Sequence, residues 1–493
     1  MSIVLNTSTA LLTAIQMAEA DRLTTANGIS DIDLMENAGR PVAQAILQRW
    51  ARCPVIVLCG PGSNGGDGFV VARRLAEVNW PVRIALLVPR DQLRGPAAHH
   101  AALWRGAVEC MAPESLDGAE LVVDAIFGAG LSRPLEGAAA TTLAAAAARK
   151  LPIVAVDVPS GLMGDSGLSL GAVKCVLTVT CFRKKPGHLL LPGRSLCGEV
   201  VVVDIGTPVS VFGEVNPDTF ENDPRLWASA LPKLAENDNK YTRGHALLIG
   251  GYPATGAARM AARAAARSGA GLTTIAVPEL ALPIYAASLT SIMVSPLVIA
   301  EDLQLLLSDS RYTGFLIGPG TGCGPATRVQ VQEILKTGRP TVLDADALST
   351  FRDDLSVLSR SIIGPCVLTP HEGEFTRLFD VSGDKLTRTR AAARACGAII
   401  VLKGSDTVIA APDGRAIINA NAPPTLATAG AGDVLGGIIL GLLAQGMDPF
   451  LAAAASVWLH GAAASAFGPK LLAEDIPDLL PTVFSQLQAL PRS

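Results

Sequence analysis

Short runs of apolar, mostly β-branched residues recur along most of the chain, and alanine-rich stretches separate many of them. Several runs are apolar at almost every position rather than at alternate positions, as in PVIVLC (54–59) and VVVV (200–203). Continuous apolar runs suit strands buried on both faces of a parallel sheet. The alternation of such strands with helices predicts a doubly wound α/β fold.

The strand-like runs fall into two series. Between them, residues 206–243 collect Pro, Asn, Asp and Glu without sustained periodicity, which is typical of a linker. The chain of 493 residues is also too long for a single core. We therefore predict two doubly wound domains, residues 1–220 and 221–493. The predicted strands lie at 54–59, 82–88, 119–124, 152–157, 175–181, 199–204, 245–251, 272–277, 314–320, 340–348, 366–370 and 398–410.

Composition narrows the classes of function. The net charge of -4 offers no basic stripe, so we expect no nucleic-acid partner. Nine scattered cysteines without a C-x-x-C pair indicate a reducing compartment, and the first residues lack the features of a signal peptide. The stretch that most resembles a membrane segment, 434–446, is too short to span a bilayer. We expect a cytoplasmic protein without a membrane partner.

The first series opens with a glycine-rich loop, GPGSNGGDG (60–68), between a predicted strand and a predicted helix. Its amides can hold phosphate oxygens. Asp67 would repel a pyrophosphate docked at the helix start, although it could simply cap the helix. Polar side chains also follow other strands of this series: Asp124, Asp157 and Ser160. Asn64, Asp124 and Ser160 offer oxygens suited to a hard cation. Asp124 and Asp157 could instead accept hydrogen bonds from loop amides.

Three motifs of this half, GPGSNGGDG, DAIFGAGLSRPLEG (124–137) and DVPSG (157–161), resemble the YjeF N-terminal domain family over about residues 10–215. Its enzymatic members are NAD(P)H-hydrate epimerases with a Rossmann-like fold. The resemblance implies potassium bound by Asn64, Asp124 and Ser160, and Asp157 as general acid and base. It implies contact between the damaged cofactor and Ser63, Asn64, Gly65, Gly66, Asp67, Gly128, Ala129, Gly130, Leu131, Ser132, Arg133, Pro134 and Asp157. The chain departs from the family at Ser63, where Asn is usual, and at Ala129, where Thr is usual.

The second series carries five motifs at the ends of its strands: GPGTG (318–322), DADAL (344–348), LTPHEGE (368–374), KGSDT (403–407) and LATAGAGDVLGG (426–437). Amides at the helix start in GAGD can form an anion site for a phosphoryl group, and Asp433 can take the proton of an attacking hydroxyl. Each motif alone has a plainer explanation, such as a turn for His371, a surface hairpin for KGSDT and a helix cap for GAGD. The sequence has neither zinc-ligand spacing nor a Walker motif.

The order of these motifs resembles the ribokinase-like superfamily, and within it the ADP-dependent NAD(P)H-hydrate dehydratases, over about residues 225–485. The resemblance implies that the hydrated nicotinamide nucleotide contacts Ala257, Gly320, His371 and Asp433. It implies that ADP contacts Lys403, Gly404, Ser405, Asp406, Thr407 and Gly432. Phosphoryl transfer leads us to expect Mg²⁺, with unassigned ligands. Glu372 stands where the family commonly has Pro.

Together the two resemblances predict a bifunctional repair enzyme. Its first domain would interconvert the R and S forms of NADHX and NADPHX. Its second would dehydrate the S form to NAD(P)H with ADP as co-substrate, which gives AMP and phosphate. We also expect a homo-oligomer. Two alternatives stay open: a small-molecule kinase that the first domain only regulates, and a first domain that senses a nucleotide without catalysis.

Overall fold

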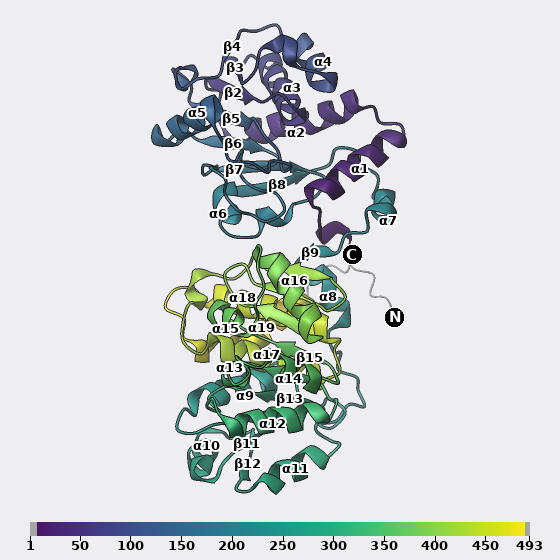
Figure 1. Ribbon diagram of the computed structural model, residues 1–493, viewed down its shortest axis with the longest axis vertical. Helices are drawn as coiled ribbons and strands as arrows, with labels where there is room; N and C mark the ends of the chain where they lie inside the picture. The colour runs from purple at the N-terminus through teal and green to yellow at the C-terminus, as the bar shows by residue number, and fades with distance from the viewer. Residues whose placement is uncertain (1–6, 489–493) are drawn as a thin grey trace. The chain divides into compact units, whose positions relative to one another are not determined.

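The computed structural model describes residues 7–488 and divides the chain into two compact units (Figure 1). The first unit is Ala10–Thr219. The second contains the described residues from Phe220 onward together with Thr7–Thr9. Each unit is built around its own sheet.

The first unit holds a seven-stranded parallel sheet in the order β4-β3-β2-β5-β6-β7-β8. Every residue of β2, β5 and β6 is buried, as their continuous apolar runs predicted. The strand order reverses between β2 and β5, and ligands of doubly wound sheets bind at such a point. The strands are β2 (Val55–Cys59), β3 (Val82–Leu86), β4 (Val108–Cys110), β5 (Leu121–Ala125), β6 (Ile153–Val156), β7 (Leu177–Cys181) and β8 (Glu199–Val203).

Helices cover both faces of this sheet. Val57 belongs to the core that also holds side chains of α2 and α3, whereas its neighbour Ile56 belongs to the core that holds side chains of α5. Successive residues of a strand point to opposite faces, so the two cores lie on opposite sides of the sheet. The helices are α1 (Ala14–Ala26), α2 (Asp31–Arg49), α3 (Ser63–Glu77), α4 (Gly95–Leu103), α5 (Gly137–Ala148), α6 (Gly193–Cys197) and α7 (Phe212–Val215).

The sheet of the second unit contains the order β18-β17-β16-β15-β14-β13-β10-β11-β12. Its strands from β16 to β12 are parallel, whereas β17 and β18 are antiparallel to their neighbours. The switch point lies between β10 and β13. The strands are β10 (His245–Ile249), β11 (Leu272–Pro278), β12 (Met293–Leu297), β13 (Gly314–Ile317), β14 (Thr341–Leu343), β15 (Cys366–Leu368), β16 (Ile399–Leu402), β17 (Val408–Ala410) and β18 (Ala416–Ile418).

Two predicted strands of this unit are wrong in detail. The predicted strand 398–410 is an antiparallel hairpin of β16 and β17, and KGSDT forms its turn. The predicted strand 340–348 ends at Leu343, and the short helix α13 (Asp346–Ser349) begins soon afterwards. The apolar pattern identifies the buried residues in both cases. It does not indicate where the chain reverses direction at 403–407 or where a helix begins after Leu343.

Helix α17 (Ala431–Ala444) packs against α9 and α18, and nearly all of its residues are buried. Residues 434–444 of the most membrane-like stretch thus belong to a core helix, and Gln445 and Gly446 lie beyond its end. Helix α18 (Pro449–Phe467) is long and apolar enough to cross a membrane by length and composition, and 72% of its most apolar window is buried in the protein. The other helices are α8 (Pro224–Trp227), α9 (Gly256–Arg267), α10 (Leu282–Ser288), α11 (Ala300–Ser308), α12 (Pro325–Lys336), α14 (Leu355–Ser361), α15 (Glu372–Leu378), α16 (Lys385–Cys396) and α19 (Ile476–Gln488).

The predicted linker, residues 206–243, is partly folded, because its middle contains β9 (Thr219–Glu221) and α8. Trp227 is fully buried and packs against Trp458 of α18, with ring centroids 5.7 Å apart. Its indole N–H donates to Asn222 Oδ1 at 3.0 Å, and Asn222 in turn donates to the carbonyl of Ala454 at 2.8 Å. The segment around α8 is therefore part of the second unit's core.

Candidate active sites

The glycine-rich loop after β2 lies against the chain that follows β5. A Cβ atom on Gly60 would lie 1.9 Å from the carbonyl oxygen of Ile126, so no other residue fits there without a shift of the backbone. Helix α3 starts at Ser63, directly after this contact. The loop thus brings the amino end of a helix to the switch point of the sheet, which suits an anionic ligand.

A cavity of about 750 Å³ opens at this point of the first unit. Ten of the predicted cofactor contacts lie in its wall: Ser63, Asn64, Asp67, Gly128, Ala129, Gly130, Leu131, Ser132, Arg133 and Asp157. Gly65, Gly66 and Pro134 adjoin these residues in the chain but are not in the wall. The structure therefore brings together polar residues that follow three separate strands.

Asp157 is held rigidly at this cavity. Its backbone has a φ of 68°, a left-handed conformation that costs a residue with a Cβ about 1 kcal/mol or more. Its Oδ2 accepts from the backbone N–H of Ala129 at 3.1 Å. Its Oδ1 accepts from the hydroxyl of Thr180 at 2.9 Å and from the ammonium group of Lys185. Contacts from two loops thus stabilise the strained residue.

Lys185 fixes the charge of the Asp157 carboxyl, and His188 binds the Asp157 backbone. Burial on its own would raise the pKa of the Asp157 carboxyl, but the ammonium charge and hydrogen bond of Lys185 lower that pKa to about 2. His188 Nδ1 accepts from the Lys185 backbone N–H at 2.9 Å, so its proton lies on Nε2. Nε2 donates to the Asp157 carbonyl at 2.9 Å. Burial and the Lys185 charge lower the pKa of His188 to about 4, which keeps this imidazole neutral.

Three further carboxyls line the same cavity, those of Asp21, Asp31 and Asp67. The surroundings of two of them raise the carboxyl pKa instead of lowering it. Burial, followed by the charges of Asp157 and Asp21, raises the pKa of Asp67 well above its usual value. Burial raises the pKa of Asp21 to about 6. Asp67 is therefore a neutral acid at a pH at which Asp157 is a carboxylate.

Asp124 and Ser160 lie together but not in the cavity wall. Asp124 is fully buried; its Oδ1 accepts from the Ser160 hydroxyl at 2.6 Å, and its Oδ2 accepts from the Ser160 backbone N–H at 2.8 Å. Burial raises the pKa of Asp124, although the hydrogen bonds from Ser160 oppose this shift. Within residues 7–488 no Lys or Arg side chain forms an ion pair with Asp124. The predicted alternative, in which Asp124 and Asp157 accept from loop amides, holds for both residues.

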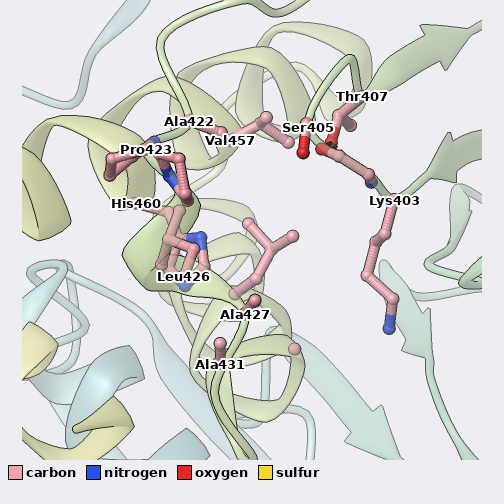
Figure 2. Close-up of a pocket in the computed structure, with 14 residues that line it drawn as sticks. Lys403, Ser405, Thr407, Ala422, Pro423, Leu426, Ala427, Ala431, Val457 and His460 are labelled. Atoms are coloured by element: carbon pink, nitrogen blue, oxygen red, sulfur yellow. Dashed lines mark hydrogen bonds between the residues drawn. The ribbon is translucent and has the colours of Figure 1, made fainter. Parts of the chain in front are cut away.

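The second unit has a cavity of about 280 Å³ between the hairpin turn and α17 (Figure 2). Five of the predicted ADP contacts line it: Lys403, Gly404, Ser405, Thr407 and Gly432. The sixth, Asp406, is not in the wall, because its carboxylate accepts from Lys385 at 2.6 Å. Leu426, Val457 and His460 lie among the other wall residues (Figure 2). The cavity therefore combines an apolar wall with the amides of a turn and of a helix start.

Asp433 lies in the first turn of α17, beside the buried ion pair of Lys403 and Asp344. The Lys403 ammonium donates to Asp344 Oδ1 at 2.8 Å. Burial alone would lower the pKa of Lys403, but the charges of Asp344 and Glu374 raise it. Burial, followed by the charge of Asp344, raises the pKa of Asp433 to about 7. Asp433 is thus a carboxyl that changes its protonation state near neutral pH.

The predicted contacts of the hydrated cofactor lie at the same edge of the sheet as Asp433. Gly320 follows β13, and Gly251 follows β10. The two residues are so close that a Cβ atom on Gly251 would lie 1.5 Å from the carbonyl oxygen of Gly320. Ala257 lies in the first turn of α9. His371 caps α15, since its Nδ1 accepts from the backbone N–H of Gly373 at 2.9 Å. None of these four predicted residues is in the wall of the 280 Å³ cavity.

The sequence did not single out several residues of these sites. Lys185 and His188 act on Asp157 and follow β7, so the rule that finds polar residues after strands could have found them. Thr180 lies within β7. Asp21 comes from α1, and only the folded chain brings it to the cavity. The apolar wall of the second cavity has no signal of its own, because it depends on how α18 packs.

Comparisons with known proteins match this architecture. A family model described as YjeF-related protein N-terminus matches residues 31–187, and one described as NAD(P)H-hydrate dehydratase matches residues 246–482. The chain is 38% identical over 515 residues to the Bifunctional NAD(P)H-hydrate repair enzyme Nnr of Moorella thermoacetica, a match that covers 97% of each chain. The chain belongs to this family.

A second curated relative agrees with this assignment. The chain is also 38% identical to the enzyme of the same name from Salinibacter ruber, over 97% of this chain and 96% of that protein. A crystal structure of the ADP/ATP-dependent NAD(P)H-hydrate dehydratase from Bacillus subtilis, co-crystallized with ATP and Mg²⁺, shares 32% identity. That match covers 52% of this chain and 95% of the other, with a TM-score of 0.46. The family memberships predicted for both halves are confirmed.

Proposed function

We propose that this chain repairs hydrated nicotinamide cofactors in two steps, one in each unit. The first unit interconverts the R and S forms of NADHX and NADPHX. The second unit dehydrates the S form with ADP and releases NAD(P)H, AMP and phosphate. The observation that carries the proposal is the match of both units to one bifunctional family, with a reactive carboxyl at the ligand edge of each sheet.

In the first unit, the loop at 60–68 and the loop at 128–133 would enclose the hydrated cofactor. The hydroxyl of the hydrate is on the ring carbon bonded to nitrogen, so the configuration changes only if a bond at that carbon breaks and forms again. Asp157 is ionised and rigidly held, which suits it to take the hydroxyl proton as a general base.

Potassium suits the residues around Asp124 in charge and in ligand type. Asp124 is a fully buried carboxyl without a cationic partner among the described residues, and hydroxyl and amide oxygens of Ser160 and Asn64 are the other predicted ligands. Oxygen ligands suit hard cations. We propose that the ion would neutralise Asp124 and hold the loops after β2 and β5 in place.

In the second unit, hydroxide is a poor leaving group and must first be converted to a better one. Asp433 would take the proton of the substrate hydroxyl as this oxygen attacks the terminal phosphorus of ADP, and AMP would leave. The lone pair of the ring nitrogen would then expel phosphate, and the neighbouring ring carbon would lose a proton to the released phosphate, which gives NAD(P)H. A pKa of about 7 suits a general base at neutral pH. Lys403 and the amides at the start of α17 would offset the phosphate charge.

Magnesium fits this site mainly through the nucleotide. No group of three or more His, Cys, Asp or Glu side chains in residues 7–488 could hold a metal ion by itself. The nearby carboxylates have partners: Asp344 Oδ1 accepts from Lys403, and Glu374 Oε2 accepts from the His371 backbone N–H. Mg²⁺ commonly takes substrate phosphates, waters and one or two carboxylates, so we propose that ADP phosphates would supply most of its ligands. The ion would neutralise charge on those phosphates.

The cellular setting stays a proposal. All nine cysteines are free, which supports a reducing, cytoplasmic compartment. The homo-oligomer and the absence of nucleic-acid and membrane partners stay predictions.

The test is to incubate the full chain with ADP, Mg²⁺ and a mixture of both NADHX epimers, and to follow the absorbance of reduced nicotinamide. Wild type should convert the whole mixture, and Asp433→Asn should convert almost none. Asp157→Asn should convert only the S epimer at the normal rate. Phosphorylation of an alcohol metabolite without any recovery of NADH would favour the kinase alternative. Normal consumption of the R epimer by Asp157→Asn would favour a nucleotide sensor.

A further inference from the structure

Among the described residues, the cavity wall of the first unit holds four carboxyls, of which Asp31 is exposed, and two cations, of which Arg133 is exposed and Lys185 is buried. Asp21, Asp67 and Asp157 all lie in its wall, and the Lys185 ammonium is hydrogen-bonded to Asp157. The Asp67 carboxyl makes no hydrogen bond to any other residue in the described part of the chain, and it comes from α3, whereas Asp157 follows β6. A base alone does not open the ring, because the ring nitrogen must also receive a proton. Asp67 lies in the same cavity wall as Asp157 and could donate that proton.

We propose that Asp67 is a second catalytic residue of the first unit, the general acid that acts together with Asp157. The proposal rests on the proposed epimerase function and deepens it. The resemblance implies only that Asp67 contacts the substrate, whereas here it supplies the proton that opens the ring.

The surroundings of Asp67 keep it protonated. The titratable groups that face it are Asp21 on α1, Cys59 on β2, Asp157 after β6 and Cys181 on β7, with Lys185 beside Asp157. Burial raises the pKa of both thiols, so they stay neutral. The two carboxyls add negative charge, and the Lys185 ammonium is hydrogen-bonded to Asp157. Environments that push the pKa values of two neighbouring carboxyls apart create an acid and a base at the same pH.

The reaction balances with these two groups. Asp157 takes the hydroxyl proton, the O–H electrons form a carbonyl at the ring carbon, and the bond from this carbon to the ring nitrogen breaks. Asp67 gives its proton to that nitrogen, which leaves as an enamine N–H. Rotation about the adjacent carbon–carbon bond presents the other face of the carbonyl. Ring closure then returns the N–H proton to Asp67 and the proton on Asp157 to the oxygen, so no other reactant is consumed.

The test measures epimerisation by Asp67→Asn, which keeps the shape of a protonated carboxyl but cannot donate an acidic proton. We expect kcat to fall by about 10²- to 10⁴-fold while KM stays within about 3-fold of wild type. The wild-type kcat should decline at high pH as Asp67 loses its proton, and Asp67→Asn should lack this decline. Asp67→Glu should recover part of the rate together with the decline.

Controls separate chemistry from folding. Asp117→Asn makes the same change at a side chain that is 72% exposed and should epimerise normally. The dehydratase rate on the S epimer should be unchanged in every variant. Asp67→Asn with a kcat within about 3-fold of wild type, with only a raised KM, or with the alkaline decline intact would overturn the role of Asp67. If wild type itself does not epimerise, the proposed function falls, and this proposal falls with it.

Discussion

Replacing Lys185 by methionine will leave the Asp157 carboxylate in the cavity wall without its cation. Lys185 is 1% exposed, and its ammonium donates to Asp157 and to the Thr180 hydroxyl. Methionine fills most of the same volume, so the change removes the charge and its hydrogen bonds rather than the packing. The substitution therefore measures what the buried ion pair contributes to the free energy of unfolding.

The pKa of Asp157 sets the expected size and pH dependence. It is about 2 in the folded chain against 3.8 for the free group, which corresponds to about 2 kcal/mol of stability. This contribution is present above about pH 4 and is lost as the pH falls through about 2. Removing one partner of a buried pair costs about 3–5 kcal/mol, since the other charge stays buried. The loss should be largest at neutral pH and smaller in acid, where Asp157 of the variant takes a proton.

The assay is hydrogen exchange of the β6 and β7 amides in increasing urea, which reports the first unit of the whole chain. At pH 7, Lys185→Met should lose about 3–5 kcal/mol, and the double variant with Asp157→Asn should recover most of it. The control, Arg149→Met, breaks an exposed ion pair with Asp117 and should lose less than about 1 kcal/mol. A loss under about 1 kcal/mol for Lys185→Met, or no recovery in the double variant, would refute the reasoning.

Three further predictions concern other parts of the chain. Asp433→Asn should lower the dehydratase kcat by about 10²- to 10⁴-fold. The wild-type kcat should fall as the pH drops below about 7, because Asp433 is then protonated. Steady-state kinetics across pH will check both expectations. Gly60→Ala places a Cβ 1.9 Å from a backbone carbonyl and should abolish epimerisation, whereas Gly213→Ala, which meets no atom within 4 Å, should epimerise normally in the same assay. Trp227→Ala should lower the stability of the second unit by about 3–5 kcal/mol in urea titrations, whereas Leu234→Ala, at a residue that is 71% exposed, should change it little.

The sequence predicts both sheets and most of the first site for one physical reason. Strands buried on both faces leave a continuous apolar run, and in a parallel sheet the residues that follow such runs meet at one edge. Asn64 and Asp157 were found in this way. Lys185 was not, because it stands in a run of three cations with Arg183 and Lys184, and no pattern indicates which of the three is buried.

Other features depend on partners that are distant in sequence. Trp227 lies in a segment with the composition of a loop and is buried only because α18 covers it. The predicted strand 398–410 runs through the turn at KGSDT, because the apolar runs on both sides of the turn read as one strand; the alternative of a hairpin at KGSDT is the one that the structure shows. The opposite charge states of Asp67 and Asp157 arise from burial and from the position of one ammonium group, and neither can be read from spacing.

The contacts around Asp157 also bear on the order in which the protein is made. Every group that holds this carboxyl lies between Ala129 and His188, and the first unit ends at Thr219. The ribosome therefore completes this site while the second half of the chain is still untranslated, and domains generally fold in the order of synthesis. The second unit can complete its fold only near the end of synthesis, since Arg263 of α9 pairs with Asp478 of α19, the last helix described. Translation thus delivers the first activity before the second.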